Sequence, residues 1–133
     1  MAPALTDITP YDADESALAL AREMQPLWRK AASLMIGTDY YPLTECRKAA
    51  EDFYAAQFHD PAAERGLVHL INGAAAVETD FTIALKGLDP NARYELTSAE
   101  SHDLRTFAGE QLLAGVPLHL DKKAADLWFY SKV

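Results

Sequence analysis

The chain has 133 residues, 50% of them apolar, and carries a formal net charge of −8 at pH 7. This length corresponds to about one domain, and the apolar content is enough for an ordinary hydrophobic core, which excludes a disordered chain. The acidic balance excludes general nucleic-acid binding and disfavours anionic membrane surfaces, because like charges repel.

Several other classes are excluded by motifs that the sequence lacks. No apolar run reaches the roughly eighteen residues that span a bilayer, and residues 1–10 lack the basic and apolar regions of a signal peptide. The single cysteine, Cys46, permits no internal disulfide and favours a cytoplasmic location over secretion. Glycine-rich phosphate loops and metal-ligand spacings are absent, so we expect no cofactor and no metal.

A helix is predicted first, from a capping residue among Asp12, Asp14 and Ser16 to Ile36. Pro26 interrupts this helix at a cost of ~3 kcal/mol, so either the helix kinks there or two helices meet, with the proline in the first turn of the second. Residues at helical spacing form one apolar stripe, which must be buried somewhere: Leu20, Met24, Leu27, Ala31 and Leu34.

The rest of the chain is predicted to be β. Residues 38–45 read as a loop, because Pro42 forbids helix and favours an extended Tyr41. Residues 46–50 are open to a short helical turn. Residues 53–58 (FYAAQF) predict a strand ending in a turn at 59–61, and residues 67–71 (LVHLI) predict a central strand buried on both faces.

The most regular pattern lies between residues 77 and 120. Apolar and polar residues alternate over 77–86, turn residues follow at 87–91, and alternation resumes over 92–97, which predicts a β-hairpin. A further strand is expected at 116–120 and a last one at 127–130. The chain is therefore predicted to be mainly β: an antiparallel sandwich of roughly 7–8 strands with Greek-key-like connections, after one or two N-terminal helices.

Particular stretches of this pattern carry a resemblance: DYYPLT at 39–44, QFHDP at 57–61, LKGLDPNARYEL at 85–96 and GEQLLAGVPLHL at 109–120. Together they resemble the C-terminal end of family 36 glycoside hydrolases, the α-galactosidases or melibiases. In that family a leucine-rich helix closes a (β/α)8 barrel and an antiparallel β-sandwich follows. The resemblance implies that residues 1–45 are the end of a truncated barrel and residues 46–133 the C-terminal sandwich domain.

The resemblance also implies what this chain does not do. The family cleaves terminal α-linked galactose with retention, using two aspartates on upstream barrel strands. This sequence matches neither aspartate motif, so no catalytic residue is carried over. We expect a non-enzymatic accessory domain of a retaining α-galactosidase, with the missing barrel as one partner and a second copy, bound through the N-terminal helix, as another.

Other functions stay open at this point. The chain is also compatible with an independent carbohydrate-binding module, with the C-terminal domain of another barrel glycosidase such as family 31, or with a small stand-alone enzyme. Acidic pairs at Asp12–Asp14 and Glu78–Asp80 are interpreted as a capping turn and an outward strand face rather than as catalytic pairs.

Aromatic residues are the candidates for sugar or interdomain contacts, because flat rings suit the apolar faces of sugars. The candidates are Tyr40, Tyr41, Trp128 and Tyr130.

Overall fold

The computed structural model describes residues 14–45 and 52–133. The predictions for an extended N-terminus, for Asp12 as a cap, for the segment 46–50 and for Cys46 lie outside these residues. Within them the chain is mainly antiparallel β, with one long N-terminal helix, as predicted. No helix in the described ranges is long and apolar enough to cross a membrane.

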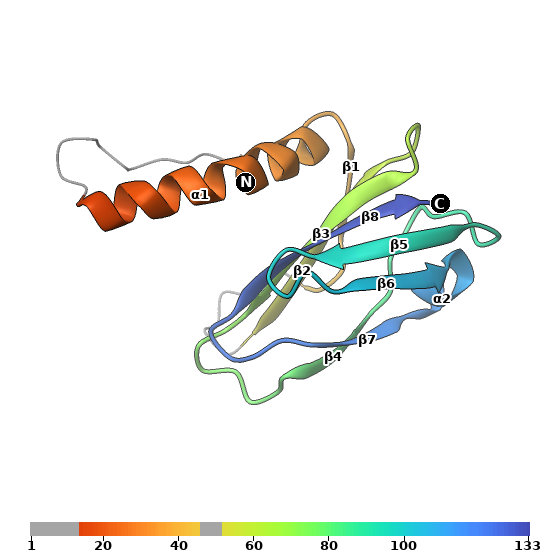
Figure 1. Cartoon of the computed structure of the whole chain (residues 1–133). Helices are drawn as coiled ribbons and strands as arrows, with labels where there is room; N and C mark the ends of the chain where they lie inside the picture. The colour runs from red at the N-terminus through yellow and green to blue at the C-terminus, as the bar shows by residue number, and fades with distance from the viewer. Residues whose placement is uncertain (1–13, 46–51) are drawn as a thin grey trace.

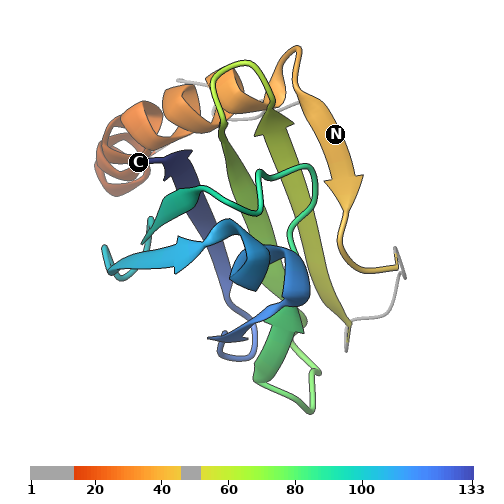
Figure 2. The ribbon, with the colours of Figure 1, turned by 90° about the vertical axis from the view of Figure 1, so that its right-hand side faces the viewer.

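The strands form two sheets that enclose a core. The large sheet has six strands in the order β1-β2-β3-β8-β5-β6, and the small one pairs β4 with β7. Helix α1 and the small sheet lie on opposite sides of the large sheet (Figure 1), an arrangement that the side view also shows (Figure 2). The elements are α1 (Glu15–Met35), β1 (Asp39–Pro42), β2 (Phe53–Asp60), β3 (Arg65–Asn72), β4 (Asp80–Ile83), β5 (Arg93–Ser98), β6 (Leu104–Ala108), α2 (Gly109–Ala114), β7 (Val116–His119) and β8 (Ala125–Lys132).

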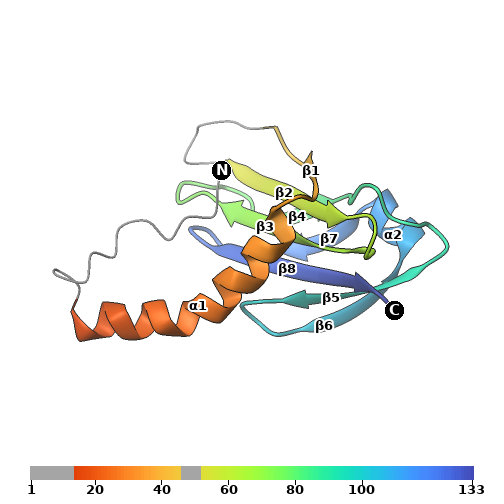
Figure 3. The same ribbon diagram turned by 90° about the horizontal axis from the view of Figure 1, so that it is seen from above.

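Helix α1 is one continuous helix in spite of its proline. The Asp14 carboxylate caps it by accepting a hydrogen bond from the Ala17 backbone N–H at 2.8 Å. Pro26 lies inside the helix, and the helix axis changes direction midway along its length (Figure 3). The alternative of two separate helices is therefore excluded, and the kink is the outcome.

The apolar stripe of α1 is only partly buried. Ala31 and Leu34, in its C-terminal half, pack with Leu67 and Phe129 on the outer face of the large sheet. The N-terminal half extends beyond the edge of the sheet (Figure 1).

The main core lies between the two sheets. It contains most of the residues expected to point inward from the alternating segments: Ile83, Leu85, Tyr94, Leu96, Val116, Leu118 and Leu120. Strand β3 is central, as predicted, and is buried from both sides: Val68 and Leu70 face the core, and Leu67 faces α1.

The predicted hairpin between residues 77–86 and 92–97 is wrong. Strand β4 pairs with β7, whereas β5 pairs with β6 and β8 in the other sheet. The segment between them crosses from one sheet to the other and buries Leu85 and Leu88 on the way. In this segment the Gln57 side chain pairs with the backbone groups of Lys86. Gln57 Oε1 accepts a hydrogen bond from the Lys86 N–H at 2.8 Å, and Gln57 Nε2 donates one to the Lys86 carbonyl at 2.9 Å.

Two local predictions also need correction. Residues 39–42 form the edge strand β1 rather than a loop, since an edge strand tolerates Pro42 at its end. His59 and Asp60, expected in a turn, belong to β2, where His59 is buried. The short helix α2 and the strand β6 have no counterpart among the predicted elements.

Candidate functional site

A polar groove lies at one end of the sandwich, where the β5–β6 loop faces the segment between β7 and β8. Its volume is about 550 Å³. It is lined by Ser98, Asp103, Arg105, His119, Asp126 and Trp128, among others. No single stretch of sequence builds it, because these residues come from two separate segments of the chain, 96–105 and 119–128.

Asp126 organises the interior of the groove. Its Oδ2 accepts hydrogen bonds from Ser98 Oγ and from Trp128 Nε1, both at 2.7 Å. Its Oδ1 accepts from the backbone N–H groups of Leu127 at 2.7 Å and Glu100 at 3.2 Å. Both oxygens are therefore occupied by the chain's own donors, and the Trp128 indole is fixed in orientation.

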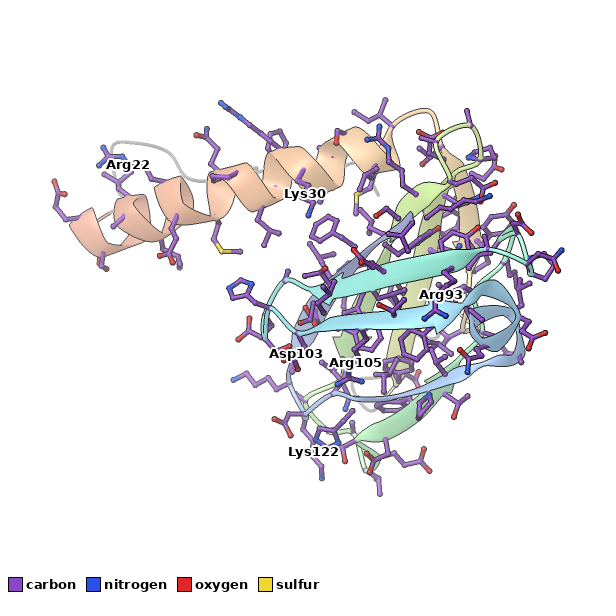
Figure 4. The ribbon with its side chains drawn as sticks, turned by 45° about the vertical axis from the view of Figure 1, so that its right-hand side comes forward. Arg22, Lys30, Arg93, Asp103, Arg105 and Lys122 are labelled. Carbon is purple, nitrogen blue, oxygen red and sulfur yellow. The ribbon has the colours of Figure 1, made fainter. Side chains whose placement is uncertain are left out.

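The rim of the groove carries charges of both signs. Arg105 Nη2 lies 4.0 Å from Asp103 Oδ2, and both side chains are more than half exposed. The Arg105 guanidinium also lies 5.9 Å from the Trp128 ring centroid. In the side-chain view Arg105 lies between β6 and β7, and Asp103 lies at the beginning of β6 (Figure 4).

His119 lies on β7, lines the groove and contacts Asp80 on the paired strand β4. Its Nδ1 lies 2.9 Å from Asp80 Oδ1, and its Nε2 lies 3.3 Å from Asp121 Oδ1. The hydrogen bond to Asp80, and then the one to Asp121, raises the pKa of His119 above its ordinary value. No group of three or more metal-ligating side chains occurs among the described residues.

The predicted contact residues of β8 face the core. Trp128 and Tyr130 are 8% and 3% exposed and point into the space between the sheets, whereas Leu127 and Phe129 face α1. The Tyr130 ring lies within the fold, where no ligand can stack on it, and Trp128 only borders the groove.

Tyr40 and Tyr41 lie on the edge strand β1. Tyr40 is 51% exposed, packs its ring 5.2 Å from that of Phe58, and has its hydroxyl 3.3 Å from that of Tyr54. Tyr41 is half-buried, with its hydroxyl 3.5 Å from the Asp39 carboxylate. The role of these two tyrosines in sugar or interdomain contacts stays a prediction.

Sequence reasoning missed the polar residues of the groove. Ser98, Asp103 and Arg105 belong to one short polar stretch, SAESHDLR at 98–105. Asp126 meets it through the pairing of β5 with β8, whereas His119 lies on β7 in the other sheet and reaches the groove through the packing of the two sheets. The available signal was the concentration of polar residues in this loop.

Asp14, Glu78 and Asp80 are the members of the two acidic pairs that lie within the described residues; Asp12 lies outside them. Asp14 is the N-cap of α1, and its hydrogen bonds from the Ser16 hydroxyl and the Ala17 backbone lower its pKa. Glu78 and Asp80 are exposed, and Asp80 contacts His119. The position of Asp14 agrees with a capping turn and that of Asp80 with an outward strand face, whereas Glu78 precedes β4.

Comparisons with known proteins find similar folds among solved structures but no similar sequence among curated proteins. Neither a family model nor a curated protein sequence matches the chain. Among solved structures, the GH36 α-galactosidase AgaB from Geobacillus stearothermophilus superposes with a TM-score of 0.72 at 22% identity, over 92% of this chain. The galactosidase domain of the α-galactosidase-sucrose kinase AgaSK gives a TM-score of 0.69 at 21% identity, over 93% of this chain.

The α-galactosidase from Lactobacillus brevis is also similar, with a TM-score of 0.75 at 12% identity over 96% of this chain. The chain spans only 17% of the AgaB and AgaSK chains and 18% of the Lactobacillus brevis enzyme. A long helix followed by a two-sheet β domain is thus shared by all of them, and this chain has the fold of the C-terminal β domain of GH36 α-galactosidases.

Proposed function

We propose that this chain is a non-catalytic C-terminal accessory domain of a retaining, α-galactosidase-like glycosidase, and that it supports the catalytic barrel. One observation carries the proposal: nearly the whole chain, α1 included, superposes on a minor part of several α-galactosidases, 92% of this chain on 17% of AgaB and 96% on 18% of the Lactobacillus brevis enzyme.

The chemistry of the groove supports a role without catalysis. A retaining glycosidase needs one carboxylate as nucleophile and a second carboxyl group as acid and base, ~5–5.5 Å apart. In the groove, Asp126 is the most buried carboxylate, and its two oxygens already accept four hydrogen bonds from Ser98, Glu100, Leu127 and Trp128. It has no lone pair directed at a substrate that would make it a nucleophile.

The shape of α1 supports a structural role. Its C-terminal half is anchored to the large sheet, and its N-terminal half projects with Leu20 and Met24 exposed at 59% and 45%. An exposed apolar side on a projecting helix is expected in a domain that packs this helix against a larger neighbouring core. We propose that the catalytic barrel covers this side in the complete enzyme, and that a second copy covers it when the barrel is absent.

A galactosidase assay tests the absence of catalysis. The purified chain, incubated with a chromogenic α-galactoside, is expected to release no more chromophore than heat-denatured chain does. Activity that co-purifies with the chain and disappears in the Asp103→Asn variant would overturn the proposal. Activity that is unchanged in that variant would instead identify a contaminating enzyme, which mass spectrometry of the active fraction would confirm.

A second experiment tests the supporting role. The corresponding segment of the AgaB chain would be deleted and this chain supplied in its place, as a fusion. We expect the fusion to recover soluble enzyme that the deletion alone does not give, and the Leu20→Glu variant of the fusion to recover less. Equal recovery with and without this chain would contradict the proposal.

A further inference from the structure

We propose that the groove between the β5–β6 loop and the segment joining β7 to β8 is a binding site for a neutral saccharide, held by Asp103 and Arg105 on its rim. The proposal goes beyond the supporting role and does not depend on it. It rests on the geometry of the groove, on the charged groups of both signs that line it and on the rigidity of its interior.

The dimensions of the groove suit a small ligand. Its volume of about 550 Å³ falls within the ~300–1,000 Å³ typical of small-molecule sites. It lies at the end of the sandwich, among loops carried by paired strands, where binding residues commonly occur. A sugar ring can enter from solvent because the groove is partly open to it.

The interior of the groove is held rigidly. Asp126 fixes the Trp128 indole and also the backbone at Glu100, and Ser98 Oγ accepts from the backbone N–H groups of Glu100 at 3.2 Å and Ser101 at 3.0 Å. Each donor and acceptor of this network is satisfied by another part of the chain. A site of this kind binds without first ordering its own walls, which lowers the cost of binding.

The rim offers groups that are not saturated. The 4.0 Å separation between Arg105 Nη2 and Asp103 Oδ2 exceeds hydrogen-bond distance, so both side chains retain free donors and acceptors that face the groove. A carboxylate accepts from one sugar hydroxyl while a neighbouring guanidinium donates to the next, because each hydroxyl both donates and accepts. This pair therefore matches two adjacent hydroxyls of a sugar ring.

The charges that face the groove oppose an anion and leave groups of both signs for a neutral ligand. They comprise carboxylates of Glu100, Asp103, Asp121 and Asp126 and cations of Arg105 and Lys123, with His119 beside them. The carboxylates outnumber the cations, so an anion is repelled. A cation would meet Arg105 and Lys123 on one side, and the oxygens of Asp126 are already occupied by the chain's own donors. A polyhydroxy compound can pair with both kinds of group without burying a net charge.

Nuclear magnetic resonance of the complete chain tests the proposal with melibiose and raffinose as probes. The two tryptophans, Trp28 in α1 and Trp128 at the groove, provide an internal comparison. We expect a saturable shift of the Trp128 indole N–H signal, with a dissociation constant on the order of 1–10 mM, and no shift of the Trp28 signal.

Matched variants decide whether the rim pair is responsible. Asp103→Asn and Arg105→Gln change exposed side chains, so the fold is expected to persist, and each is expected to weaken binding at least ~10-fold. Arg93→Gln is the control for Arg105→Gln, because it removes a positive charge at the far end of β5 (Figure 4). This variant is expected to bind the saccharides like the unmodified chain. Equal affinities in all the variants would overturn the assignment to this pair.

Two other results would overturn the choice of ligand. The first is the absence of a saturable Trp128 shift with either saccharide. The second is a Trp128 shift with inorganic phosphate or with a diamine but not with the saccharides, which would make the groove an ion site. Binding of a neutral sugar should also be unchanged by added salt, unlike binding of either ion.

Discussion

At the scale of single residues, Asp89 and Tyr94 make the hydrogen bonds that hold the stretch GLDPNARYEL in place. The Asp89 carboxylate accepts from the Asn91 backbone N–H at 2.9 Å and closes the turn. The Tyr94 hydroxyl accepts from the Asp89 N–H at 3.0 Å and donates to the Glu64 carboxylate. One side chain thus connects this turn to the β2–β3 turn.

The QFHDP stretch is organised around Tyr130. The Tyr130 hydroxyl accepts from Gln57 Nε2 at 2.8 Å, donates to the Phe58 carbonyl at 3.3 Å and lies 3.0 Å from His59 Nδ1. If His59 Nδ1 carries the proton, the hydroxyl accepts two hydrogen bonds and donates one, which satisfies it fully. His59 Nε2 is then a buried lone pair, in agreement with its lack of a partner within the described ranges.

Tyr94→Phe is expected to cost about 1–3 kcal/mol of unfolding free energy, because the Asp89 N–H and the Glu64 carboxylate both lose a buried partner. It should also change the response to alkali. Burial, and then the hydrogen bond to Glu64, raises the pKa of Tyr94 from 10.0 to about 12. Stability gained from the neutral phenol is complete below the unfolded pKa and is lost as the pH rises from 10 to 12.

Urea unfolding at several alkaline pH values checks this prediction. The unmodified chain should lose stability between pH 10 and 12 more steeply than the Tyr94→Phe variant, since the variant lacks the titrating group. Parallel slopes for the two proteins would contradict the assignment of this loss to Tyr94.

Gly66 is required by close packing. A Cβ at this position in β3 would overlap the Phe58 carbonyl oxygen and the Tyr130 hydroxyl. Gly66→Ala is therefore expected to lower the unfolding free energy by about 3 kcal/mol, through forced displacement of the β2 backbone. Gly37→Ala is the control, because nothing lies near its Cβ position and only its φ of +71° opposes the change, at about 1–2 kcal/mol. The prediction fails if the two variants unfold at the same urea concentration.

At the scale of elements, the sequence predicts which side of a strand is buried more reliably than it predicts which strand lies beside it. Alternation correctly assigned inward residues in β4, β5 and β7. It could not show that β4 pairs with β7, which is more than thirty residues away in sequence, because the period of two constrains faces and not partners. The edge strand β1 was missed for a related reason: its pattern is exposed nearly throughout.

The anchoring of α1 on the sheet can be tested with a matched pair of leucines. Leu34 is buried against Leu67 and Phe129, and Lys30 Nζ lies 3.9 Å from the Phe129 ring centroid. Leu34→Ala is expected to lower the unfolding free energy by about 2–3 kcal/mol. Leu20→Ala, on the same helix but exposed, is expected to change it by less than about 0.5 kcal/mol in the monomer. A similar effect of both substitutions in urea unfolding would show that the helix does not dock as described.

For the whole molecule, the fold was predictable to the extent that local patterns and a family resemblance determine it. The helix, the central strand and the two-layer β architecture follow from periodicity, whereas the groove does not. Asp126 and Ser98 are 28 residues apart in sequence and meet only because β5 pairs with β8. A site assembled by non-local pairing leaves no spacing for a sequence pattern to detect.

The unburied side of α1 bears on the state of association of the whole chain. Leu20 and Met24 are one helical turn apart and exposed, so two copies can pair their helices about a two-fold axis, each covering the other's stripe. The net charge of −8 opposes this approach, because two acidic molecules repel. We therefore expect a concentration-dependent dimer that becomes tighter as salt screens the repulsion.

Size-exclusion chromatography with light scattering, over a range of protein concentrations and at two salt concentrations, measures this equilibrium. The mass should rise from that of a monomer toward twice that value as concentration increases, at lower protein concentration in high salt. Leu20→Glu should keep the chain monomeric, since a charge at the centre of the apolar contact would be buried unpaired. Arg22→Gln, a change on the same helical turn that leaves the apolar residues intact, should dimerise at least as well as the unmodified chain. A mass that stays monomeric at every concentration, or a dimer that persists with Glu at position 20, would place the contact elsewhere.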